Sequence, residues 1–134
     1  MSNRRGMTLL LVLMLGAFIG MSAMLLFSTT NLDMMIAGNN RRLNQAKISA
    51  ASGLNHFTAL RLNHNTLREQ SRGLQTLQII PETQLSPQTS YEVKIHFFPA
   101  LNERQYVVES IGYYKKGGKT LSIHPVKALF EGGE

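Results

Sequence analysis

Histidines, carboxylates and hydroxyl groups are the side chains of this sequence that could carry chemistry. The four histidines are His56, His64, His96 and His124. His56 and His64 lie eight residues apart, two helical turns rather than one, so they are poorly placed to bind one metal ion together. The eight carboxylates are scattered and form no calcium-type loop. The serines and threonines lie in no nucleophile-elbow motif, and no glycine-rich phosphate loop follows a strand. We therefore expect no enzyme, no metal site and no cofactor, and histidines at surfaces or interfaces.

A local basic cluster is the second group with chemical potential. Lys115, Lys116 and Lys119 flank a Gly-Gly pair, directly after Tyr113 and Tyr114. Lysines can contact phosphates and tyrosines can stack on bases, so the cluster is a candidate DNA-binding site. A solubilising hairpin tip and a contact with partner proteins are the alternatives.

Composition limits the classes of protein further. The chain has 134 residues, with 14 Lys and Arg against 8 Asp and Glu, a net charge of +6. Such a charge attracts nucleic acid, anionic lipid or an acidic protein and selects none of them. There is no cysteine, which excludes disulfides, thiolate nucleophiles and Cys-based metal sites. About a hundred residues follow the N-terminal apolar segment, enough for one small domain.

The N-terminal apolar segment has the length of a membrane span. Arg4 and Arg5 precede residues 7–27, which carry no charge. As a helix, this segment is about 31 Å long and matches a hydrocarbon core of about 30 Å. The apolar run continues beyond Gly20 and Ser22, so a retained span is favoured over a cleaved secretory signal. The two arginines favour a cytoplasmic N-terminus, although cations beyond the span weaken this bias.

The residues around Gly6 resemble a known processing site. Arg4-Arg5-Gly6 followed by Met7-Thr8-Leu9 and an apolar run resembles the leader of type IV prepilins. Residues 28–54 are similar to the start of PilX-type minor pilins, which are related to K-type minor pseudopilins of type II secretion. The resemblance covers about residues 4–57. It implies cleavage between Gly6 and Met7 by a prepilin peptidase, N-methylation of Met7 and an inner-membrane location.

The sequence departs from the pilin pattern at Leu11. Most pilins carry Glu at this fifth position of the mature chain, where the resemblance implies pairing with the N-terminal amine of the subunit ahead. A lone carboxylate in hydrocarbon costs several kcal/mol, so it is tolerated only with a cation. A subunit with nothing ahead of it needs no such Glu, which favours a place at the filament tip. The alternative is that Leu11 is simply a lipid-facing residue. Ile36 and Ser52 also depart from the family, which usually has Met and often has Glu there.

Two helical patterns are expected to position these residues. Gly16 and Gly20 form a Gly-x-x-x-Gly spacing that lets a second helix approach closely, although glycine is also common in membrane helices. Beyond the span, an apolar stripe recurs every seven residues and predicts a helix as far as Arg61 to Asn65. Its main members are Ile36, Leu43, Ala50 and Phe57. Gly38 and the two following asparagines predict a bend or fray.

The remaining sequence predicts a small sheet. Residues 67–90 are expected to form a loop with one optional strand, and residues 91–97 alternate as a half-buried strand does. Residues 105–114 and 120–130 are β-rich and joined by a glycine hairpin turn, with Pro125 at an edge or a break. The predicted class is α+β with a type IV pilin-like fold. Its parts are a leader (1–6), a membrane half-helix (7–27), an extramembrane half-helix (28–65) and a loop with an antiparallel meander (66–134).

These observations favour a structural function. The resemblance implies a minor pilin of a type IV pilus priming or tip complex, anchored once in the inner membrane, with its C-terminal domain periplasmic before assembly and at the pilus tip afterwards. Its expected partners are other minor pilins, the major pilin and the prepilin peptidase. The alternatives are a tip module that binds DNA or a surface, and a minor pseudopilin of a type II secretion system.

Overall fold

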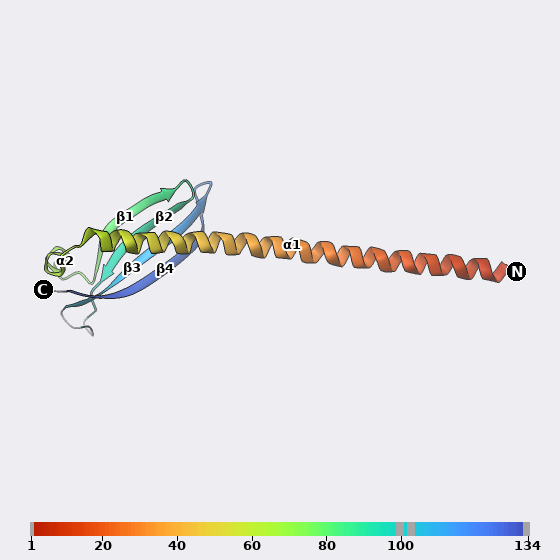
Figure 1. Cartoon of the computed structure of the whole chain (residues 1–134), viewed down its shortest axis with the longest axis horizontal. Coiled ribbons are helices and arrows are strands. Elements are labelled where there is room, and N and C mark those ends of the chain that lie inside the picture. The colour runs from red at the N-terminus through yellow and green to blue at the C-terminus, as the bar shows by residue number, and fades with distance from the viewer. Residues whose placement is uncertain (1, 99–100, 102–103, 133–134) are drawn as a thin grey trace. The chain divides into compact units, whose positions relative to one another are not determined.

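The computed structural model describes residues 2–98, 101 and 104–132. Within them the chain forms two helices followed by four strands, shown in Figure 1. Their bounds are α1 Ser2–Leu60, α2 His64–Ser71, β1 Thr76–Ser86, β2 Thr89–His96, β3 Gln105–Lys116 and β4 Lys119–Glu131. The chain divides into two units, residues 1–39 and residues 40–134, and each is described by itself.

The first unit is the N-terminal part of α1. Its side chains from Arg4 to Ala37 are all exposed. Helix α1 continues without interruption through Gly38, Asn39 and Asn40, so the predicted fray is not found. The division between the units nevertheless falls at this point of the chain.

The second unit, here called the globular unit, packs the end of α1 on an antiparallel sheet of strand order β1-β2-β3-β4. This arrangement confirms the predicted α+β class. Part of the predicted stripe forms the buried face of α1: Ala50 and Phe57, with the neighbouring Ala46, have exposed fractions of 0%, 4% and 0%, whereas Ile36 is 58% exposed. Tyr91, Val93 and Ile95 of β2 are buried on the facing side of the sheet, as their alternation predicts.

The core of the globular unit changes character along the helix. Towards the C-terminal end of α1 it is built from large residues: Phe57, Leu67, Tyr106 and Val108 are buried together, with Phe130 packed against them. Phe57 meets Phe130 edge-to-face, with ring centroids 5.5 Å apart. Where α1 enters the unit, small residues replace them, so the backbone of α1 approaches the sheet closely.

The long helix ends at Leu60, next to Arg61, the earlier of the two predicted ends, and short of the later one at Asn65. Arg61 adopts a left-handed conformation there (φ 45°). A second helix, α2, then begins after Asn63, whose side chain accepts a hydrogen bond from the backbone N–H of Asn65 at 3.0 Å. The segment that was expected to continue the first helix thus begins a new one, with Asn63 as its N-cap.

The segment expected to be mostly loop contains the long strand β1. Register shifts between Gln78 and Ile80, and again between Ile80 and Thr83, accommodate Pro81. Such irregularity is tolerated because β1 is an edge strand, where a missing N–H need not break the ladder. Pro125 lies inside β4, the other edge, which confirms the expected edge position. Gly117 and Gly118 have positive φ, as the predicted hairpin turn requires.

Candidate functional site

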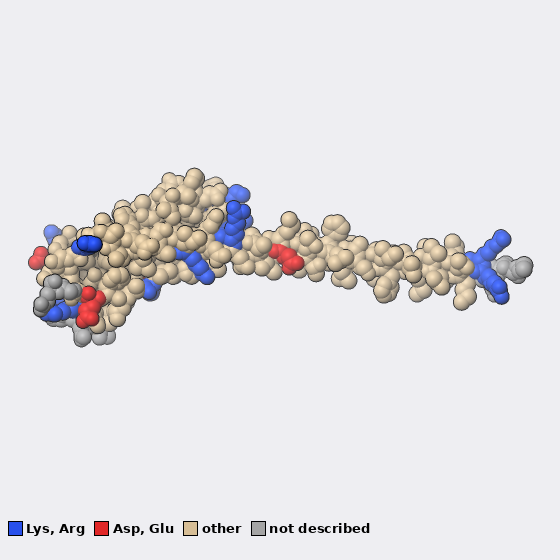
Figure 2. Space-filling view, viewed as in Figure 1, with Lys and Arg blue, Asp and Glu red and all other residues tan. Residues whose placement is uncertain are grey.

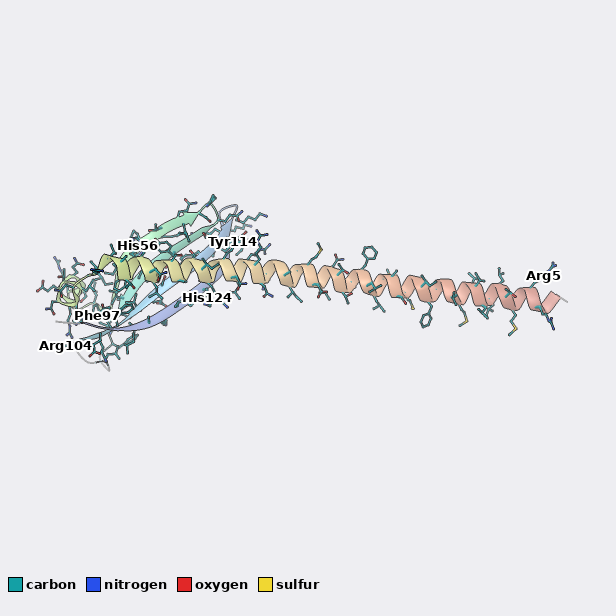
Figure 3. The ribbon with its side chains drawn as sticks, viewed as in Figure 1. Arg5, His56, Phe97, Arg104, Tyr114 and His124 are labelled. Atoms are coloured by element: carbon teal, nitrogen blue, oxygen red, sulfur yellow. The ribbon has the colours of Figure 1, made fainter. Side chains whose placement is uncertain are left out.

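The exposed apolar surface of α1 is the most extensive candidate site. Fifteen large hydrophobic residues between Met7 and Phe27 are exposed, with exposed fractions from 59% to 78%. Among the described residues, α1 is the one helix long and apolar enough to cross a membrane. Figure 3 shows side chains projecting from it over most of its length. This surface requires a nonpolar environment, and its position near the N-terminus is compatible with a single membrane span or a signal sequence.

The predicted processing and packing residues all lie on this helix. Met7 and Leu11 are exposed, at 73% and 59%. A Cβ atom built on Gly6, Gly16 or Gly20 would meet nothing within 4 Å. The structure therefore gives these glycines no role within the chain, and their predicted roles in cleavage and helix packing stay predictions.

Small residues allow the C-terminal part of α1 to pack closely on the sheet. A Cβ atom on Gly112 of β3 would lie 2.0 Å from the carbonyl oxygen of Ala46, so only glycine fits between helix and strand. Buried hydroxyls join the two elements: Ser49 donates to the backbone carbonyl of Ser90 at 2.7 Å. Ser110 donates to the backbone carbonyl of Ala50 at 2.6 Å. These contacts were not predicted from the sequence. The one feature that could have indicated them is the helical spacing of small residues within residues 46–53.

The opposite face of the sheet carries a partly buried polar network. Tyr113 donates to the carboxylate of Glu92, and Lys94 pairs with the same carboxylate at 2.9 Å. Burial acts to raise the pKa of Glu92, but the hydrogen bonds from Tyr113 and Lys94 outweigh it and place the pKa below its ordinary value. Burial and the neighbouring Glu92 raise the pKa of Tyr113. Glu92 is therefore ionised in the folded protein near neutral pH, with Tyr113 as a protonated donor.

The histidines fall at separate places in the globular unit. His56 on α1 bonds the hydroxyl of Tyr91 at 2.8 Å, while His64 on α2 stacks on Tyr106. His96 bonds Glu109 at 2.6 Å on the outer face of the sheet. Across the described ranges of the chain, no group of three or more side chains could hold a metal ion.

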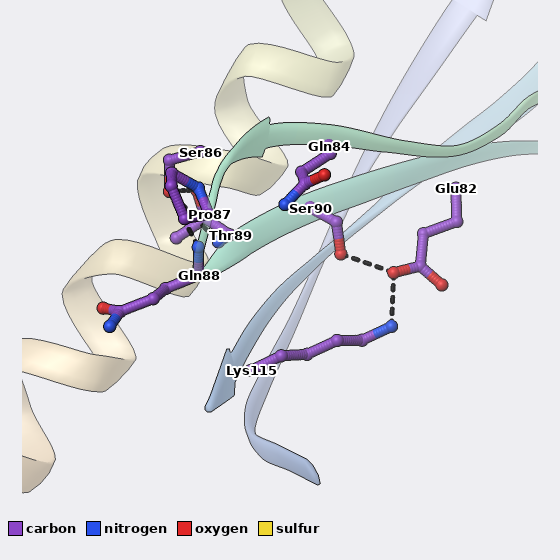
Figure 4. A pocket seen from close by; sticks show the side chains of 8 residues that line it. All are labelled: Glu82, Gln84, Ser86, Pro87, Gln88, Thr89, Ser90 and Lys115. Carbon is purple, nitrogen blue, oxygen red and sulfur yellow. Dashed lines mark hydrogen bonds and ion pairs between the residues drawn. The ribbon is translucent and has the colours of Figure 1, made fainter. Parts of the chain in front are cut away.

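The predicted lysine cluster is divided by its contacts. Lys115 pairs with Glu82, which also accepts a hydrogen bond from Ser90 at 2.6 Å, as Figure 4 shows. The hydrogen bond from Lys115, followed by that from Ser90, lowers the pKa of Glu82. Lys116 and Lys119 instead extend into solvent at the hairpin turn. The sequence places the three lysines together but does not predict Glu82 as the partner of Lys115, because residues 67–90 were expected to be mostly loop.

Lys115, Glu82 and Ser90 border a shallow polar pocket of about 250 Å³ at the β1–β2 turn (Figure 4). Its lining residues are Glu82, Gln84, Ser86, Pro87, Gln88, Thr89, Ser90 and Lys115. Lys115 and Glu82 neutralise each other, and Gln88 accepts a hydrogen bond from Tyr114 at 3.0 Å. These internal pairings leave the pocket without a charge that would select an anion or a cation.

The long apolar helix and the four-stranded antiparallel sheet beneath its C-terminal end define a pilin-like architecture. Comparisons with protein-family models, with curated proteins and with solved structures found no match. The architecture therefore rests on the geometry of this chain itself.

Proposed function

We propose that this chain is a minor pilin, a structural subunit of the priming and tip complex of a type IV pilus. The observation that carries the proposal is the contrast within α1. Around Ala50 one face of the helix is buried against the sheet, whereas residues 7–27 are exposed on every face of the same continuous helix. Such a helix joins a folded unit to a long apolar surface that is free for other molecules.

Two environments suit that surface in turn. Before assembly, residues 7–27 span the inner membrane, because their helical length of about 31 Å matches the hydrocarbon core. After assembly, the helices of neighbouring subunits cover them in the filament. Gly16 and Gly20 support this second state, because they leave room for another helix backbone and have no contact within the chain.

Leu11 supports a place at the tip rather than in the shaft. A shaft subunit is expected to present a carboxylate to the amine of the subunit ahead, and this chain presents a leucine there. Its own N-terminal amine at Met7, once exposed by cleavage after Gly6, is still able to receive the carboxylate of the following subunit. The amine of Met7 would thus bind the following subunit, and the chain would need no subunit ahead of it.

Intact-mass analysis of the membrane-extracted protein tests the processing step. Coexpressed with an active prepilin peptidase, the chain should begin at N-methylated Met7. Replacing Gly6 with Val should block cleavage without disturbing the fold, because a Cβ atom at this position meets nothing. A wild-type chain that keeps residues 1–6 while the same peptidase processes a major pilin would contradict the proposal. Cleavage at the C-terminal end of the apolar segment would instead identify a signal sequence.

Co-purification tests the assembly role. The processed chain should bring other minor pilins with it from detergent-solubilised membranes, and cells lacking it should carry fewer pili. Normal piliation in its absence, together with no recovered pilin partner, would refute a priming function even if processing occurs.

A further inference from the structure

The net charge of the globular unit is concentrated at one end. Antiparallel strand order places the β1–β2 and β3–β4 turns at the same end of the sheet. Gly112 lies against Ala46 and Ala50, and β3 continues from there towards the turn at Gly117, which is therefore the end where α1 enters the unit. Figure 1 shows both turns at this end, and Figure 2 shows basic side chains gathered there.

The charge count makes the asymmetry quantitative. Residues 40–134 carry twelve Lys and Arg and seven Asp and Glu, an excess of five positive charges. Six of the cations lie at the start of the helix in this unit and beside the two turns, together with one acid, Glu82 of β1, which gives an excess of five. The other described residues of the unit carry six cations and four acids, an excess of two. Most of the positive excess among the described residues therefore lies at one end of the unit.

Five of these cations have no ion pair within the described part of the chain, since Lys115 alone is held by an acid. We call this set the basic end: Arg41, Arg42, Lys47, Lys116 and Lys119. All five side chains are exposed. No internal acid therefore competes with an external anion for them.

We propose that the basic end contacts the anionic headgroups of the membrane that holds the α1 span. The inference rests on the membrane insertion in the proposed function, and not on the tip role. Residues 28–39 connect the span to the basic end, a helical length of about 18 Å. The headgroup layer accounts for about 5–7 Å of it on one side of the bilayer. The length of helix that remains between the headgroup layer and the basic end is comparable to the reach of a lysine side chain plus the Debye length of about 8 Å.

DNA is the competing partner for the same charges, and the geometry disfavours it. A DNA strand would have to reach the end of the unit that is joined to the membrane span. Tyr114 is buried, with an exposed fraction of 8%, and the Nζ atom of Lys115 lies over the ring of Tyr113, 5.3 Å from its centroid. Neither tyrosine ring is therefore free to stack on a base, which removes the aromatic half of the predicted DNA site.

Fluorescence energy transfer in lipid nanodiscs tests the contact with the full chain. The chain has no cysteine, so Thr120→Cys gives a unique donor position beside the exposed turn. The acceptor is a labelled headgroup lipid. Transfer should be greater in discs that contain phosphatidylglycerol than in phosphatidylcholine discs, and high salt should remove the difference. Each cation at an anionic surface favours the docked state about fivefold.

Charge reversal at the basic end supplies the decisive variant. K116E/K119E should lower the docked-to-free ratio in phosphatidylglycerol discs by at least about 25-fold. R61E/R72E makes the same change of charge at the opposite end of the unit and should leave the ratio unchanged. R41Q/R42Q should lower it without touching the turn. Near-ultraviolet circular dichroism checks that each variant keeps its fold.

The outcomes separate the two proposals. Failure of the chain to insert into phosphatidylcholine discs would refute the membrane span and this inference with it. Insertion with equal transfer in both lipids, or equal losses in K116E/K119E and R61E/R72E, would refute the lipid contact alone. A DNA gel shift in phosphatidylcholine discs that K116E/K119E abolishes, without any effect of phosphatidylglycerol, would assign the basic end to nucleic acid.

Discussion

Replacing Gly112 with Ala tests the closest approach in the globular unit. The new Cβ atom would lie 2.0 Å from the carbonyl oxygen of Ala46 and 2.5 Å from the backbone nitrogen of Ala50. Both neighbours are backbone atoms, so no side-chain rotation can relieve the overlap. Helix α1 and strand β3 must separate by at least about 1 Å to relieve the overlap.

The cost follows from the contacts that span the same gap. A separation of 1 Å stretches the hydrogen bonds of Ser49 and Ser110, now 2.7 and 2.6 Å, beyond bonding range. Each lost bond costs about 0.5–1.5 kcal/mol, and overpacking adds about 1–3 kcal/mol. The expected loss of stability is therefore about 2–6 kcal/mol. For a domain of this size, even the lower value lowers Tm by about 8–16 °C.

Thermal unfolding followed by near-ultraviolet circular dichroism measures this effect in the full chain in detergent. All four tyrosines of the protein lie on β2 and β3, so their signal reports the globular unit. Gly38→Ala is the matched control, because its Cβ atom meets nothing within 4 Å. Gly53→Ala should be intermediate, since its closest neighbours are side chains of Ser110 and Tyr91. A Gly112→Ala variant as stable as Gly38→Ala would refute the close approach.

Three further predictions concern assembly and pH. Replacing Gly16 and Gly20 together with Leu should lower incorporation into pili, measured on sheared filaments, because a second helix could no longer approach; unchanged incorporation would remove the packing role. Leu11→Glu should reduce binding to the other minor pilins in co-purification, because its carboxylate would meet no cation, and unaltered binding and piliation would argue against the tip position. Because the pKa of Glu92 is lowered in the folded state, its stabilisation is present above about pH 4 and is lost as pH falls below that value. Glu92→Gln should therefore flatten the acid side of the Tm profile, and an unchanged profile would contradict the role of its bond to Tyr113.

Matched controls separate these effects from loss of the fold. Phe18 and Ser22 lie two positions beyond the two glycines, on nearly the opposite face of α1, so Phe18→Leu with Ser22→Leu keeps the spacing but not the packing surface. Leu10→Glu places the same carboxylate beside position 11, where no subunit pairing is expected. Glu131→Gln removes an exposed carboxylate at the end of β4 and should leave the acid profile as it is.

The sequence was sufficient for the elements whose patterns are long and regular. The seven-residue stripe through Ala50 and Phe57 and the alternation of residues 91–97 each have one dominant period, and each predicted the buried face of its element. The uncharged run of residues 7–27 predicted a helix and no particular face. The glycine pair at the hairpin was also informative, because a tight turn requires positive φ there.

What the sequence could not provide depends on partners distant along the chain. β1 contains Pro81 and three register shifts, so its alternation is interrupted and only pairing with β2 identifies it as a strand. The ion pair of Lys115 with Glu82 likewise follows from that pairing. Gly112 seemed an ordinary strand residue, and its necessity is visible only with the backbone of Ala46 beside it.

The energetics of α1 restrict how such a subunit could move from a membrane into a filament. Fifteen large hydrophobic residues between Met7 and Phe27 are exposed. Transferring them from hydrocarbon to water would cost about 20–45 kcal/mol, at about 1.5–3 kcal/mol for each side chain. A small domain is stable by only about 5–15 kcal/mol, so a force that pulled the helix into water would unfold the globular unit first. Under the proposed function, the apolar segment would therefore have to pass directly from lipid to the helices of neighbouring subunits, with partner contacts formed while it is still in the membrane.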